Sequence, residues 1–102
     1  MAANWRVLRS AAAKADLYEI WCYIAAHDDL AADRWLQKFD AAFARLAAFP
    51  GLGNTRPELP DGIYAFSVNP FLILYIQQPE QQLVTILRVI DARRDFASLF
   101  LT

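Results

Sequence analysis

Cysteine and histidine are almost absent from this sequence of 102 residues: Cys22 and His27 are each the only residue of their kind. A single cysteine excludes a disulfide within the chain and a metal site built on paired cysteines. A triad of the serine or cysteine type would have to use His27, at the predicted end of a helix, where a solvated or capping histidine is the more ordinary interpretation. We therefore expect no metal, no cofactor and no catalytic residue.

An excess of charge of either sign is also missing, because ten Lys and Arg stand against eleven Asp and Glu, a net charge of −1. Proteins that bind the nucleic-acid backbone usually carry a clear positive excess, so we expect no direct specific nucleic-acid binding by this chain alone. No apolar run approaches the roughly 20 residues that span a bilayer, so we expect no membrane contact. A free thiol without a visible export signal favours the cytoplasm.

Apolar residues, in contrast, are abundant, at 57% of the chain, and aromatic residues make up 14%. A typical domain takes roughly 100–200 residues, so we expect residues 1–102 to form one domain. A domain of this size buries only about 60–68% of the surface of its unfolded chain. Part of the large aromatic surface is therefore expected to bind a partner.

Hydrophobic periodicity predicts two helices, at about Ala11–Ala26 and Leu30–Phe49. Ser10 suits the N-cap of the first helix, and either carboxylate of Asp28-Asp29 suits that of the second. Only a few residues separate the helices, which favours an antiparallel αα-hairpin. The stripe opposite the apolar face of the first helix is more polar and consists of Asp16, Glu19, Tyr23 and His27.

Short apolar runs predict the strands. One run, Trp5–Arg9, precedes the helices, and three follow the long loop Pro50–Gly62: Ile63–Asn69, Phe71–Gln77 and Leu83–Ile90. Short connections between the last three predict an antiparallel meander. Asp91–Phe100 has the pattern of a short terminal helix with Asp91 as its cap. The expected fold is α+β: the hairpin packs on one face of an antiparallel sheet, with the N-terminal strand at an edge, and another element covers the second face.

Arginines are the remaining candidates for chemistry: Arg56 in the loop, Arg88 in the last strand and the pair Arg93-Arg94 in the tail. A set of arginines recognises carboxylate or phosphate through bidentate hydrogen bonds. Arg88 interrupts an apolar strand, where a charge is costly unless it is paired. The alternative is that these arginines only form ion pairs with acidic residues nearby in the sequence: Glu58, Asp91 and Asp95.

The order of elements and several segments resemble the toxins of the RelE/ParE superfamily, in particular the ParE branch. Ala15–Ile24 resembles the first helix of that family, and Pro50–Leu59 resembles its PGxGxxRPEL segment. Phe71–Tyr75 is similar to its central strand, and Arg88–Asp95 to its closing motif. These segments span nearly the whole chain in the expected order.

The resemblance implies the toxin of a type II toxin–antitoxin module, neutralised by a ParD-like antitoxin whose C-terminal segment wraps around it. Characterised ParE-like toxins act on DNA gyrase, whereas the RelE branch cleaves messenger RNA in the ribosome through a basic cleft and, in many members, a Tyr or His near the C-terminus. Here neither residue follows Tyr75, and the net charge is −1. We expect a protein-binding gyrase inhibitor; a RelE-like ribosome-dependent endoribonuclease is the alternative, and a member that binds its antitoxin and little else is a third.

Two sets of residues are expected to form the binding surfaces. Arg56, Arg88, Arg93 and Arg94 are expected to converge at one end of the sheet and bind the target. The antitoxin is expected to cover aromatic side chains that the small fold leaves exposed: Tyr18, Trp21, Trp35, Phe96 and Phe100.

Overall fold

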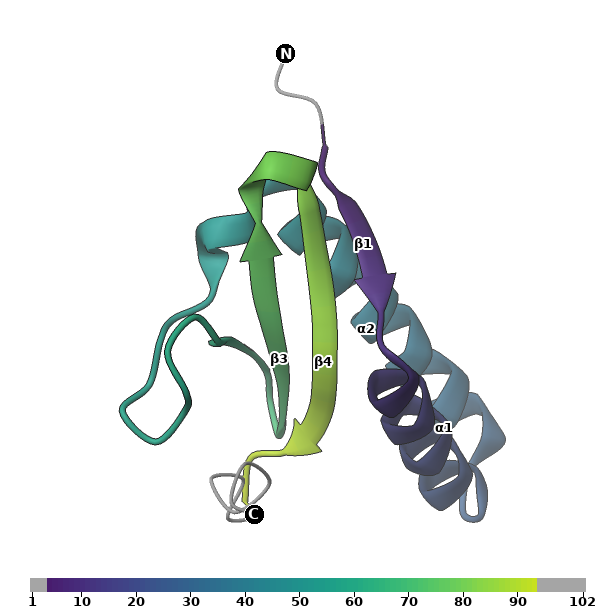
Figure 1. Ribbon diagram of the computed structural model, residues 1–102. Helices are drawn as coiled ribbons and strands as arrows, with labels where there is room; N and C mark the ends of the chain where they lie inside the picture. The colour runs from purple at the N-terminus through teal and green to yellow at the C-terminus, as the bar shows by residue number, and fades with distance from the viewer. Residues whose placement is uncertain (1–3, 94–102) are drawn as a thin grey trace.

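The computed structural model describes residues 4–93. Two helices pack on one face of a four-stranded sheet with the strand order β1-β4-β3-β2 (Figure 1). The elements follow in chain order: β1 (Arg6–Arg9), α1 (Ala11–Ala25), α2 (Asp29–Ala48), the 3-10 turn η1 (Pro50–Leu52), β2 (Tyr64–Val68), β3 (Phe71–Gln78), the 3-10 turn η2 (Pro79–Gln81) and β4 (Leu83–Asp91). The α+β fold is confirmed, while the expected terminal helix falls largely on residues 94–102, outside the described range.

The sheet is mixed. β2, β3 and β4 form the expected antiparallel meander, and β1 lies at an edge as expected, but it pairs with β4 in parallel. The helical hairpin explains why β1 and β4 run in the same direction. Two antiparallel helices return the chain to the end of the sheet where β1 starts, and at that end the Trp5 N–H donates to the Ala47 carbonyl at 2.9 Å. β2 therefore runs parallel to β1, and two further reversals give β4 the same direction.

Both expected helix caps are present. The Ser10 hydroxyl accepts a hydrogen bond from the Ala13 N–H at 3.0 Å, and the Asp28 carboxylate accepts one from the Ala31 N–H at 3.1 Å. The Ser10 hydroxyl also donates to the Leu87 carbonyl at 2.9 Å. Each cap satisfies an amide that a helix leaves without an internal partner, and Ser10 additionally ties the start of α1 to β4.

Separate apolar clusters cover the two faces of the sheet. The helices bury one face, and the largest members of this cluster are Leu17, Phe39, Phe43, Leu46, Ile73, Tyr75 and Ile86. On the other face, Leu59 and Ile63 of the long loop pack with Leu72, Leu74 and Ile90. The second face is therefore covered, as expected, and the covering element is the loop between α2 and β2.

Tyr75 anchors the start of that loop. Its side chain is fully buried; the hydroxyl donates to the Pro50 carbonyl at 2.7 Å and accepts from the Gly53 N–H at 2.8 Å. A Cβ on Gly53 would lie 2.7 Å from the Tyr75 hydroxyl oxygen and 2.8 Å from the Ala65 carbonyl oxygen, so only glycine fits. Burial raises the pKa of the Tyr75 phenol. The second glycine of the PGxG segment is thus required by a contact with β3.

Candidate partner-binding site

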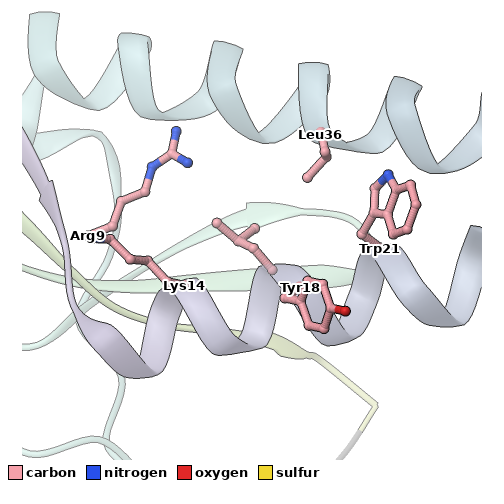
Figure 2. A pocket seen from close by; sticks show the side chains of 6 residues that line it. Arg9, Lys14, Tyr18, Trp21 and Leu36 are labelled. Atoms are coloured by element: carbon pink, nitrogen blue, oxygen red, sulfur yellow. The ribbon is translucent and has the colours of Figure 1, made fainter.

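A solvent-open groove of about 380 Å³ runs between α1 and α2, and Figure 2 shows the side chains that surround it. Its lining consists of Arg9, Lys14, Leu17, Tyr18, Trp21 and Leu36. Most of these residues come from one side of α1, because positions 14, 17, 18 and 21 recur at the three- and four-residue spacing of a helix face. The groove is therefore a continuous feature of the hairpin.

Contacts between elements hold the walls of the groove. The Trp21 indole N–H donates to the Asp33 carboxylate on α2 at 3.2 Å. At the other end, the Arg9 guanidinium donates to Asp40 at 2.7 Å and lies 4.7 Å from the centre of the Phe43 ring. These contacts join α1 and β1 to α2, so the groove is formed before any partner binds.

Tyr18 and Trp21, two of the residues expected to bind the antitoxin, line this groove. Tyr18 is 69% exposed, an unusually large exposure for an aromatic side chain next to an apolar wall. A hydrogen bond with Cys22, one turn further along α1, raises the pKa of Tyr18. Tyr18 therefore offers both an apolar ring and a hydroxyl to a partner.

Trp35 lies outside the lining of the groove. Its ring packs against Phe39 and Phe71, with centroid distances of 5.8 and 5.2 Å, and the Lys38 ammonium lies over it. The structure thus gives Trp35 a packing role, and its contact with an antitoxin stays a prediction. Phe96 and Phe100 lie outside the described residues.

Sequence reasoning missed four residues of the groove: Arg9, Lys14, Leu17 and Leu36. A signal for Lys14 was present, because it precedes Tyr18 by four positions and Trp21 by seven on the same helix. Arg9 and Leu36 had no such signal, since only the packing of the hairpin brings β1 and α2 to this side of α1.

Arg88, expected to contact the target, forms a bidentate ion pair with Asp16. Its Nε and Nη2 atoms donate to the two Asp16 carboxylate oxygens at 2.7 and 2.9 Å, and the Val89 N–H donates to the same carboxylate at 2.9 Å. The hydrogen bonds that Arg88 donates to Asp16 raise the pKa of Arg88. The contact joins α1 to β4, and a role of Arg88 in target binding stays a prediction.

Asp16 was placed on the polar stripe of the first helix, yet it is buried. β1 ends at Arg9, opposite Ile86, so β4 continues beyond its edge neighbour. α1 follows directly and supplies the missing partners: the Ser10 hydroxyl bonds to the Leu87 carbonyl and the Asp16 carboxylate to the Val89 amide. Asp16 is buried because it completes the hydrogen bonding of a strand.

The other arginines also pair with carboxylates. Arg56 lies 4.0 Å from Glu58, and the Arg93 guanidinium donates to Asp91, which raises the pKa of Arg93. Asp91 is the last residue of β4, and its carboxylate also accepts the Arg93 N–H at 2.9 Å. The Arg93 side chain remains 77% exposed. Arg94 lies outside the described residues, so the convergence of all four arginines stays a prediction.

Residues 4–93 contain neither a cluster of candidate metal ligands nor a helix that could span a membrane. In this range, no three His, Cys, Asp or Glu side chains gather closely enough to ligate a metal ion. Neither helix in it combines the length and the hydropathy that a bilayer span requires.

Comparison with known proteins places the chain in a family. Residues 7–96 match the family described as the ParE toxin of the type II toxin–antitoxin system parDE. The chain is also 34% identical to Toxin ParE3 of Caulobacter vibrioides over 94 residues. This alignment covers 91% of the chain and 92% of Toxin ParE3. The chain belongs to the ParE toxin family. It is therefore a toxin of the type II toxin–antitoxin class.

Solved structures agree with the fold of this ParE-family toxin. The chromosomal ParDE system of P. aeruginosa contains a chain with a TM-score of 0.71 at 19% identity, covering 88% of this chain and 98% of that one. The RelBE2 toxin–antitoxin complex of Mycobacterium tuberculosis gives 0.64 at 22% identity, covering 89% and 94%. At these identities the likeness concerns the fold, which the two branches of the superfamily share.

Proposed function

We propose that a ParD-like antitoxin neutralises this toxin by binding in the groove between α1 and α2. The observation that supports this most strongly is the solvent-open apolar groove with Tyr18 and Trp21 on its walls. Aromatic side chains at the centre of an interface contribute a large share of binding energy. The similar structures named above are toxin–antitoxin systems, which favours the same kind of partner here.

We propose further that the toxin inhibits DNA gyrase by binding and performs no chemistry itself. Support comes from membership of the ParE family and from Arg93, whose largely exposed side chain directly follows β4. This residue does not line the groove, so an antitoxin in the groove and a target at the end of β4 use different surfaces. An acidic or phosphate-bearing surface of the target would complement the arginines.

The antitoxin part is tested by measuring the affinity of the toxin for the antitoxin encoded with it. Tyr18→Ala is expected to weaken binding about thirtyfold, equivalent to about 2 kcal/mol for an interface aromatic. Tyr23→Ala is the matched control, because Tyr23 lies on the same helix, outside the groove, and is 75% exposed. Equal affinities for the two variants would place the antitoxin elsewhere.

The target part is tested by a gyrase supercoiling assay and by mapping transcripts after induction. We expect Arg93→Glu combined with Arg94→Glu to abolish both gyrase inhibition and growth arrest, with antitoxin affinity retained. Arg6→Glu is the control, since Arg6 is exposed and pairs with Leu83 at the opposite end of β4. Cleavage of translated messages by the unmodified toxin, without gyrase inhibition, would favour the RelE-like alternative.

A further inference from the structure

The groove between α1 and α2 is apolar along most of its length and cationic at one end. Leu17, Trp21 and Leu36 form the apolar part, and Arg9 and Lys14 lie together at the end where α1 begins (Figure 2). A partner that filled only the apolar part would leave the Lys14 ammonium at its border without a counter-charge. The charge of the lining therefore restricts which segment fits.

The two cations differ in how far they are neutralised. Arg9 already pairs with Asp40 at 2.7 Å and lies over the Phe43 ring. Lys14 is exposed, and among residues 4–93 no ion pair involves it. An incoming carboxylate would therefore meet one uncompensated positive charge, with the Arg9 guanidinium nearby as a further donor.

The opposite end of the groove is acidic. Asp33 accepts the Trp21 indole N–H there, and the exposed Asp28 and Asp29 are the N-cap and the first residue of α2. The groove thus runs from positive charge at Lys14 to negative charge beyond Trp21. A partner segment with its positive end at Lys14 and its negative end beyond Trp21 would place like charges together. This orientation is disfavoured, and the reverse orientation is favoured.

Resting on the proposed function, we infer that the segment of the antitoxin that enters the groove is an amphipathic helix carrying a carboxylate that pairs with Lys14. Lys14 and Trp21 are seven positions apart on α1, which corresponds to about 10 Å along the helix axis. A helix packed along the hairpin presents its side chains at the same rise. The carboxylate therefore lies about two helical turns from the apolar side chain that contacts Trp21.

The test compares charge reversal at two positions of the toxin, with the co-encoded antitoxin as ligand. Lys14→Glu is expected to weaken binding about fivefold, mainly through slower association, and to reduce the salt dependence of the affinity. Arg34→Glu is the matched control: Arg34 is exposed on α2 and does not line the groove. Lys14→Glu introduces an acidic residue near the start of α1, which the helix dipole favours, so unfolding would not account for the weaker binding.

A second arm identifies the pairing residue in the antitoxin. Each carboxylate of the antitoxin is replaced by lysine in turn, and one such variant is expected to bind the Lys14→Glu toxin better than the original antitoxin does. If the unmodified toxin binds antitoxin but Lys14→Glu behaves like Arg34→Glu, the inference is wrong and the proposed function stands. If the unmodified toxin binds no antitoxin, or the groove instead joins two copies of the toxin in solution, the proposed function itself fails.

Discussion

Replacing Asp16 by alanine is expected to detach α1 from the end of β4 and to lower the free energy of unfolding by about 2–4 kcal/mol. Two losses make up this figure. The buried Val89 amide loses its acceptor, which costs about 1–2 kcal/mol. The Arg88 guanidinium also loses a bidentate partner. Breaking a fully buried ion pair costs about 3–5 kcal/mol. The Arg88 side chain is 32% exposed, so water replaces part of the contact and the expected cost is about 1–2 kcal/mol.

Urea unfolding followed by tryptophan fluorescence measures this effect directly. In a domain of this size, 1 kcal/mol corresponds to about 4–8 °C in melting temperature, so Asp16→Ala is expected to melt at least about 8 °C lower. Asp40→Ala is the matched control: Asp40 also holds an arginine at 2.7 Å, but its side chain is 64% exposed. This surface pair is expected to contribute less than about 1 kcal/mol.

A double-mutant cycle isolates the ion pair from the amide contact. Arg88→Met alone removes the guanidinium, and the double variant with Asp16→Ala removes both partners. We expect a coupling energy of at least about 1 kcal/mol, as for groups in direct contact. If Asp16→Ala and Asp40→Ala destabilise equally, or the coupling is absent, the assignment of Asp16 as the partner of the β4 edge is wrong.

Three other substitutions test the remaining contacts. Tyr75→Phe leaves the Pro50 carbonyl and the Gly53 N–H without the hydroxyl that they bond to. It is expected to lower the free energy of unfolding in urea by about 1–3 kcal/mol. Folding raises the pKa of the Tyr75 phenol above its unfolded value of about 10. The stabilisation from the neutral phenol is therefore complete below about pH 10 and is lost as the pH rises through the folded pKa. We expect the free energy of unfolding of Tyr75→Phe to decline less steeply at alkaline pH. Gly53→Ala is expected to destabilise by about 1–3 kcal/mol, whereas Gly51→Ala, with nothing within 4 Å of its new Cβ, serves as the neutral control; equal melting temperatures would contradict the close approach. Trp35→Ala is expected to lower the free energy of unfolding by about 2–4 kcal/mol, because the ring loses its packing contacts. A loss of antitoxin affinity at unchanged stability would contradict this packing role and assign Trp35 to the antitoxin-binding surface.

Local chemistry determined much of the fold in advance. Periodicity, the caps at Ser10 and Asp28, and the breaks around the strands predict the helical hairpin and the meander, because these signals depend only on neighbouring residues. The motifs Pro50–Leu59 and Arg88–Asp95 also suffice to indicate the ParE family. The large number of aromatic residues for so small a domain pointed to Tyr18 and Trp21 as partner contacts, and both line the groove.

Contacts between distant segments were decided only by the tertiary structure. Asp16 has the sequence pattern of a solvated helix residue, yet it pairs with Arg88, 72 positions away, because β1 ends early and leaves the edge of β4 to α1. The parallel pairing of β1 depends on the hairpin returning the chain to its starting end. The groove between the helices forms only because packing brings Leu36 of α2 next to lining residues from β1 and α1. Such features arise where packing brings unrelated segments together, and no local pattern in the chain records which segments will meet.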